Sequence, residues 1–279
     1  MTKKTHNTTR LHLDMQALTE RRAILGWIGA ASATALIAGC GGSEESTTTS
    51  GTVTTGGGSN GLCLVDPTET NGPYPSDGSN RANGSTSNIL TQTGVIRQDL
   101  RTSFGAYTGT ATGVELQLTI TIVNVNDGCS PLEGYVVYLW HCDAIGQYSI
   151  YDLPSENYLR GVGISDSNGE VVFTTIVPGC YPGRFPHTHF EIFESETTAT
   201  HYDNRLLVSQ MVVPETVCEE VYNNASGYGQ SASNLSRVSI ASDNVFADNS
   251  SDEIAMQTPE LSGNITNGYT GTVEIGIRV

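Results

Sequence analysis

The sequence predicts an all-β protein, a β-sandwich of mainly antiparallel strands with long active-site loops. Three observations support this fold class. Glycine is abundant, with 31 residues among 279, whereas only 15% of residues are charged. Apolar and polar residues alternate with a period of two in several short segments. Turn-forming residues separate these segments at spacings that suit strands better than long helices.

The clearest strand covers residues 114–122, where Val, Leu and Ile alternate with Glu, Gln and Thr. This period predicts one buried and one exposed face. Asn126-Asp127-Gly128 supplies the turn that follows. Residues 214–222 are expected to form a short helix, and residues 223–235 a loop. Runs rich in β-branched and aromatic residues predict five more strands, at 134–140, 170–176, 187–193, 206–213 and 269–277.

The first 39 residues predict an export signal. Arg21-Arg22 precedes an apolar run that is too short and too rich in Gly and Ala for a membrane-spanning helix. The paired arginines indicate the twin-arginine route, which exports folded proteins. Ile37-Ala38-Gly39-Cys40 resembles a bacterial lipobox, whose cysteine is lipidated; an ordinary signal peptide with an incidental cysteine is the alternative. We therefore expect a bacterial cell-envelope lipoprotein, on the periplasmic or extracellular face, held to the membrane only through Cys40.

Beyond the leader, residues 40–60 are rich in Gly, Ser and Thr and predict a disordered linker. Residues 61–279 then form the folded domain. Without residues 1–39 the chain has eight arginines against 27 acidic residues, a net charge of −19. Such a surface repels phosphate backbones, so nucleic acid is not expected as a partner. The sequence does not indicate an oligomeric state.

Cysteine count limits the possible disulfides. Five cysteines follow Cys40, so at most two pairs form and one thiol is left over. The sequence leaves the pairing open among Cys63, Cys129, Cys142, Cys180 and Cys218. An exported protein keeps such bonds.

A pair of histidines is the first candidate for chemistry. His187 and His189 are two residues apart on a predicted strand, so both imidazoles point to one face. Tyr181 precedes them on a Gly/Pro-bent loop, and Tyr148 follows the strand that ends at Trp140. Phenolates are hard anionic donors and imidazole suits iron, so two of each favour Fe(III). Taken alone, each tyrosine also fits a packing role.

Several motifs together resemble the intradiol ring-cleavage dioxygenases, most closely the secreted single-chain type similar to catechol and protocatechuate 3,4-dioxygenases. The resemblance spans roughly 63–279 and is densest over 130–190. The motifs that carry it are Gly72-Pro73-Tyr74, Trp140 to Tyr148, Leu159-Arg160-Gly161, Ser165 to Gly169, Phe173 to Gly179, Tyr181, His187-Thr188-His189 and Gly268-Tyr269.

This resemblance implies a β-sandwich enzyme with one non-haem Fe(III), held by Tyr148, Tyr181, His187 and His189. Such an enzyme cleaves a catechol-type ring with O2 to a muconate-type diacid. Arg184 matches the family's active-site arginine, although a surface salt bridge is the alternative. Gln210 resembles the family's second-sphere glutamine, and Tyr181 the phenolate that accepts a substrate proton. The expected partners are a small aromatic diol and O2.

Two other functions remain open from the residues alone. One is a non-catalytic binding module on the same scaffold. The other is a copper or zinc protein that uses only the two histidines. The remaining candidates are assigned structural roles: Tyr138 and Trp140 as packing residues, His141 as a structural residue, and His201 beside Asp203 as a solvated loop residue.

Overall fold

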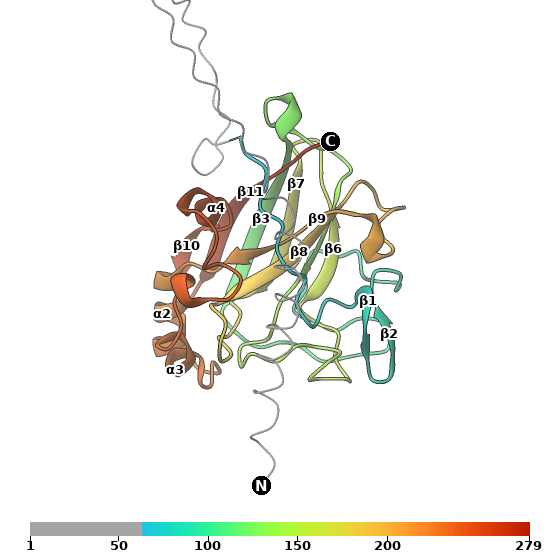
Figure 1. The fold of residues 1–279 in the computed structure, drawn as a ribbon. Coiled ribbons are helices and arrows are strands. Elements are labelled where there is room, and N and C mark those ends of the chain that lie inside the picture. Colours follow the sequence, from blue (N-terminus) through green and yellow to red (C-terminus); the bar gives the residue numbers. More distant parts are fainter. Residues whose placement is uncertain (1–62) are drawn as a thin grey trace, which may run out of the picture.

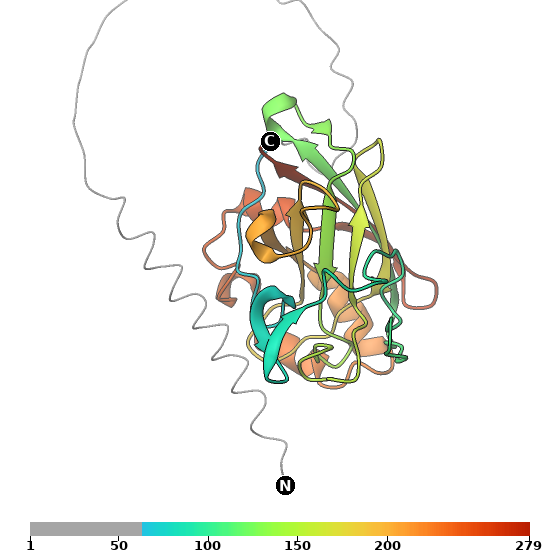
Figure 2. The same ribbon diagram turned by 90° about the vertical axis from the view of Figure 1, so that its right-hand side faces the viewer.

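The computed structural model describes residues 63–279, so the predicted leader and the predicted linker lie outside the described residues. Two larger sheets face each other as a β-sandwich, as predicted (Figures 1 and 2). The strands are β1 (Asp77–Ala82), β2 (Ser85–Asn88), β3 (Glu115–Asn124), β4 (Ser130–Pro131), β5 (Val136–Trp140), β6 (Arg160–Ile164), β7 (Glu170–Ile176), β8 (His187–Phe193), β9 (Arg205–Val212), β10 (Glu260–Asn264) and β11 (Gly268–Ile277). The helices are η1 (Val125–Asp127), η2 (Tyr202–Asn204), α2 (Glu215–Asn224), α3 (Ser231–Leu235), η3 (Ile240–Ser242) and α4 (Ser251–Met256).

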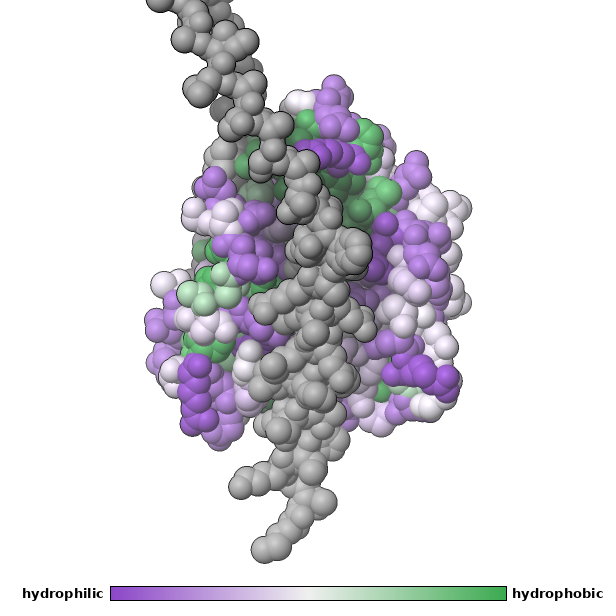
Figure 3. Space-filling view, in the orientation of Figure 1, coloured by the Kyte–Doolittle hydropathy of each residue, from purple (hydrophilic) through white to green (hydrophobic). Residues whose placement is uncertain are grey.

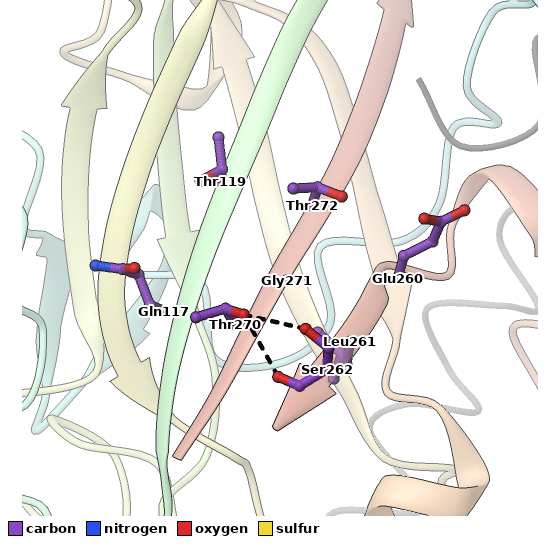
Figure 4. A pocket seen from close by; sticks show the side chains of 8 residues that line it. All are labelled: Gln117, Thr119, Glu260, Leu261, Ser262, Thr270, Gly271 and Thr272. Carbon is purple, nitrogen blue, oxygen red and sulfur yellow. Dashed lines mark hydrogen bonds between the residues drawn. The ribbon is translucent and has the colours of Figure 1, made fainter. Parts of the chain in front are cut away.

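The first sheet has five strands in the order β10-β11-β3-β4, with β7 also paired to β3. Its pairs are antiparallel except β3 with β11, which run parallel. Burial alternates along β3, as its sequence predicted. Thr119 and Thr272 project from the polar outer face (Figure 4), where they line a shallow hollow of about 340 Å³.

The second sheet is fully antiparallel, in the order β6-β5-β8-β9. Every residue of β5 and of β8 is buried, so this sheet is covered on both faces. Val137 and Leu139 point into the main core between the sheets. Tyr138 and Trp140 point the other way, into a smaller core that also contains Ile89. The predicted packing role of these two aromatic residues is therefore confirmed.

The covering elements lie on opposite sides of the sandwich. Helices α2, α3 and α4 gather on one side and the β1–β2 hairpin on the other (Figure 1). The hairpin is tied to the second sheet through its neighbours, because Tyr138 donates to the carbonyl of Pro75 at 2.6 Å. The helical side holds loops in place: the Tyr222 hydroxyl donates to the carbonyl of Pro178 at 2.7 Å.

Two sequence expectations need correction. Residues 223–235 are not only a loop, because α3 occupies the last five of them. Its residues form helix weakly on their own, but Leu235 and Ser231 are buried in the fold and hold it there. The short strands β1, β2, β6 and β10 were not predicted, because their Gly- and Ser/Asn-rich residues carry little strand signal.

One disulfide is formed among the described residues, between Cys63 and Cys129, with Cα atoms 5.7 Å apart. It fixes the start of the described chain to the turn that follows β3. Cys142, Cys180 and Cys218 are buried and form no disulfide. Burial raises the pKa of Cys180 to about 12, so this thiol stays protonated and unreactive.

Residues 63–279 contain no helix long and apolar enough to cross a bilayer. Hydrophilic side chains dominate the visible part of the described surface in Figure 3.

Candidate metal centre

The two histidines lie on the outer face of the second sheet. His187 and His189 occupy alternate positions on β8, so both imidazoles point away from the main core, as the spacing predicted. The ring of Trp140 on β5 stacks on the ring of His189, with centroids 5.0 Å apart and planes at 6°. This contact fixes the orientation of the His189 imidazole on a face that is shielded from water.

Tyr148 reaches the histidines from the loop that follows β5. The Asp143 carboxylate organises the loop by accepting hydrogen bonds from the backbone N–H groups of Ile145 and Gln147. The N–H of Tyr148 itself donates to Asp152 at 2.8 Å. These turns present the phenol to the sheet.

Tyr181 comes from a second loop, between β7 and β8, which the helices hold. The N–H of Cys180 donates to the Ser231 hydroxyl at 3.0 Å, and the Asn234 amide donates to the carbonyl of Cys180 at 2.8 Å. The α3 segment, which was expected to be a loop, therefore positions one of the candidate ligands.

The two tyrosine loops approach so closely that glycine is required between them. Gly146 has a φ of +80°, and a Cβ there would lie 2.9 Å from the Cβ of Tyr181. A Cβ at Gly179 would lie 2.3 Å from the carbonyl oxygen of Ala144. Both positions exclude a side chain, since either clash would push the phenols apart.

The four predicted ligands converge. The Nε2 atoms of His187 and His189 lie 3.1 Å apart. The hydroxyl of Tyr148 is 3.1 Å from Nε2 of His189, and the hydroxyl of Tyr181 is 3.2 Å from Nε2 of His187. Donors that bind one ion at about 2.1 Å and near right angles lie about 3 Å apart. The spacing therefore suits a single ion.

The state of the imidazoles also suits a metal. Nδ1 of His187 lies 2.6 Å from the carbonyl oxygen of Phe185, which only accepts, so Nδ1 carries the proton and Nε2 keeps its lone pair. Burial and the nearby Arg184 lower the pKa of His187 to about 3. Burial and His187 likewise place the pKa of His189 well below its ordinary value. Both rings are neutral near pH 7 and can bind a cation.

The donor set limits the kind of ion. Residues 63–279 contain no group of three or more His, Cys, Asp or Glu side chains that could hold a metal. The four converging side chains do not form such a group, because two of them are tyrosines. Phenol oxygens bind as anions only to a strongly Lewis-acidic ion, so the residues fit a ferric centre better than zinc.

Arg184 is fully buried beside these ligands and is not a surface residue. Its Nη1 lies 3.5 Å from Nε2 of His187. Its Nη2 donates to Oε1 of Gln210 at 2.7 Å. Its Nε pairs with Oδ2 of Asp243 at 3.0 Å. Gln210 in turn donates to the carbonyl of Thr70 at 2.8 Å. The structure therefore places both predicted polar residues at the site.

Comparisons with known proteins agree with this arrangement. A dioxygenase family model, Dioxygenase_C, matches residues 91–202, the range that holds the four candidate ligands and Arg184. The protocatechuate 3,4-dioxygenase beta chain of Burkholderia cepacia is 30% identical over 111 residues, which cover 35% of this chain and 45% of that relative. The chain therefore spans less than half of the length of that relative, and the matched part is similar to dioxygenases.

Solved structures support the same intradiol fold. An intradiol ring-cleavage dioxygenase from Tetranychus urticae has a TM-score of 0.57 at 22% identity, over 77% of this chain and 95% of that one. A second dioxygenase crystal structure has the same TM-score at 23% identity, also over 77% of this chain and 95% of that one. These two likenesses show the fold alone.

The most important residue at the candidate site that the sequence did not indicate is Asp243. It follows η3 and is completely buried. Besides Arg184, it accepts hydrogen bonds from the backbone N–H groups of Phe185 at 2.6 Å and Val245 at 2.8 Å. Burial alone would raise the pKa of Asp243, but Arg184 and these hydrogen bonds hold it below its ordinary value. An isolated aspartate in a Ser/Asn-rich stretch gave no signal.

A second missed feature is a cross-strand row on the site face. Arg160 pairs in register with Trp140, Trp140 with His189, and His189 with Gln210. Arg160 is buried and donates to backbone carbonyls, among them that of Tyr74 at 2.8 Å. The row shows how one sheet face assembles the site.

The other two histidines of residues 63–279 keep structural roles. His141 is buried, with Nε2 2.7 Å from the hydroxyl of Thr175 and Nδ1 2.8 Å from the carbonyl of Cys142. Burial lowers its pKa to about 4, so this ring is neutral. His201 is 42% exposed beside Asp203, the solvated position that the sequence predicted.

Proposed function

We propose that this chain is an intradiol ring-cleaving dioxygenase that uses one non-haem ferric ion to open a catechol-type ring with O2, giving a muconate-type diacid. One observation carries the proposal: two phenol oxygens and two imidazole nitrogens follow one another at 3.1–3.2 Å on a buried sheet face. The relative from Burkholderia cepacia is named for protocatechuate, a catechol with a carboxylate.

The site residues have two roles, metal binding and proton transfer. Tyr148, Tyr181, His187 and His189 would hold the ion, which supplies Lewis acidity toward the catechol oxygens and draws electron density from the ring. The phenolate oxygen of Tyr181 would accept a proton from the substrate diol.

Arg184 has a separate role toward an ionised oxygen of the bound catechol. Its Nη1 lies on the His187 side of the cluster, so it can donate to an anionic substrate oxygen bound there. Gln210 and Asp243 hold the guanidinium in that orientation. Removing such a donor typically costs about 10²–10³ in rate.

The first test is oxygen uptake by iron-loaded protein with a panel of catechols, followed by product analysis. We expect muconate-type products from cleavage between the two hydroxylated carbons, and a red-brown colour from phenolate bound to ferric ion. Arg184→Ala should lower kcat/KM about 10²–10³-fold while the iron and the colour remain. Colourless protein without stoichiometric iron, or zinc in its place, would contradict the proposal.

The proposal also includes a cellular location. The leader and Cys40 suggest export, with a lipid on Cys40 as the only membrane attachment. Intact mass spectrometry of the mature protein should show residue 40 as a diacylglyceryl-modified N-terminus. A mature N-terminus at any other residue contradicts the anchor but leaves the catalytic proposal standing.

A further inference from the structure

The charge of Arg184 is balanced within the fold. Arg184 is 1% exposed and Asp243 is completely buried, and Nε of one lies 3.0 Å from Oδ2 of the other. A buried ion pair of this kind has no net charge, so it attracts an anion less strongly than an unpaired arginine would. Nη1 of the guanidinium lies 3.5 Å from Nε2 of His187, and Nη2 donates to Gln210.

No second cationic side chain is available at the site among residues 63–279. All basic residues in this range except histidine are arginines, and of these only Arg160 joins Arg184 in touching a candidate ligand. The Arg160 guanidinium lies 5.9 Å from the centre of the Tyr148 ring, but it is buried and donates to Ser149, Tyr74 and Pro75.

The other arginines are committed elsewhere in the described chain. Five of them bond or pair with residues away from the four ligands, and Arg278 follows the last strand. These five are Arg81, Arg97, Arg101, Arg205 and Arg237.

We propose that Asp243 is a positioning residue that neutralises Arg184, and that the site therefore selects catechols with uncharged ring substituents over carboxylated ones. This inference rests on the proposed function. A ring carboxylate is separate from the two catechol oxygens that would bind the ion. Without a cationic side chain to pair with, it loses its hydration in the buried site and gains no ion pair in return. The acidic surface of the protein further lowers the local concentration of anionic substrates.

A matched pair of substrates tests the charge alone. 3,4-Dihydroxybenzamide and 3,4-dihydroxybenzoate have nearly the same shape, but only the second is an anion at pH 7. For the iron-loaded wild-type protein we expect kcat/KM for the amide to exceed that for the acid at least about tenfold, the effect of one unfavourable charge interaction in a partly desolvated site.

Asp243→Asn tests the residue. The variant keeps the shape of the side chain and leaves Arg184 with an uncompensated charge. We expect the amide-to-acid ratio to fall at least about fivefold, together with a lower kcat for the amide because Arg184 loses an anchor. Asp243→Glu keeps the charge and should keep the ratio. Asp66→Asn, at a buried carboxylate that bonds Gly276 away from the site, is the matched control and should also keep it.

The outcomes separate the two proposals. If the wild-type protein cleaves no catechol at all, the proposed function fails. If it cleaves the acid as well as the amide, or better, only the charge inference fails. The same holds if folded, iron-containing Asp243→Asn protein shows an unchanged ratio. If that variant does not fold, the wild-type comparison of amide with acid decides.

Discussion

The two sheets of the sandwich differ in how they meet water. In the first sheet, burial alternates along β3 and β11, so one face packs on the core and the other is polar and exposed. In the second sheet, every residue of β5 and of β8 is buried. The polar face carries Thr and Gln side chains without a converging set. The doubly covered sheet carries His187 and His189, and the two tyrosines approach them from loops.

This difference shows where unusual chemistry can be placed. Neutral imidazoles and an arginine paired with an aspartate need a site without bulk water, because exposure would restore ordinary pKa values and weaken every charge interaction. Only the second sheet offers such a face. The first sheet forms the other side of the core, and its outer face is exposed to water.

The largest effect is expected on the second sheet. His189→Ala should lower metal affinity by more than about 10²-fold and abolish turnover, because even indirect partners of metal ligands typically contribute 10–100-fold. Iron content by elemental analysis and the visible absorbance measure the loss.

Thr188→Val is the matched control for that experiment. Thr188 is the next residue on β8, points to the opposite face and has no partner for its hydroxyl among the described residues. We expect it to keep iron and colour. Equal iron loss in both variants would mean that β8 tolerates no change, and would remove the evidence for a specific ligand.

The next effect concerns the contact between the N-terminal segment and β11. Asp66 is buried and accepts a hydrogen bond from the N–H of Gly276 at 2.7 Å, and burial raises its pKa from 3.8 to about 7. The folded protein therefore holds a proton that the unfolded chain loses above about pH 4. The contribution of Asp66 to the free energy of unfolding is largest below pH 4, decreases as the pH rises and is lost above pH 7. The total decrease is roughly 4 kcal/mol.

Denaturant unfolding at several pH values measures this slope. Asp66→Asn should flatten the dependence of the free energy of unfolding between pH 4 and pH 7, because the amide does not titrate. A wild-type protein whose stability rises through that range after subtraction of the variant's curve would contradict the assigned direction.

The smallest effects sharpen the contrast within the first sheet. Ile120 is completely buried, so Ile120→Ala should lower the free energy of unfolding by about 3 kcal/mol. Thr119, the next residue on β3, lies on the polar face, and Thr119→Ala should change it by less than about 0.5 kcal/mol. Urea denaturation of both variants tests the pair, and similar losses would show that the outer face is covered in the whole protein.

Much of this arrangement followed from local sequence patterns. β7 and β8 begin and end where the sequence placed them, because strong β-formers lie between clear turns. The His-x-His spacing placed two imidazoles on one face through the pleat alone. The convergence of Tyr148 and Tyr181 on them was implied only by the resemblance to a family, since loop geometry has no period.

What the sequence could not show depends on distant contacts. Asp243 is 59 residues from Arg184, and nothing in its neighbours indicates a buried partner. The parallel pairing of β3 with β11 joins opposite ends of the described chain and has no local signature. The β1–β2 hairpin is rich in Ser and Asn and forms because tertiary bonds hold it, such as that from Tyr151 to Asn80 at 2.6 Å.

The row of Arg160, Trp140, His189 and Gln210 ties the site to strand register. A slip of β8 by one residue would turn His187 and His189 toward the opposite face and break the row at both neighbours. Any ion bound there is therefore bound by the native register alone, and its binding energy is withheld from every slipped form. Binding of the ion would therefore stabilise the native register of β8 relative to slipped registers.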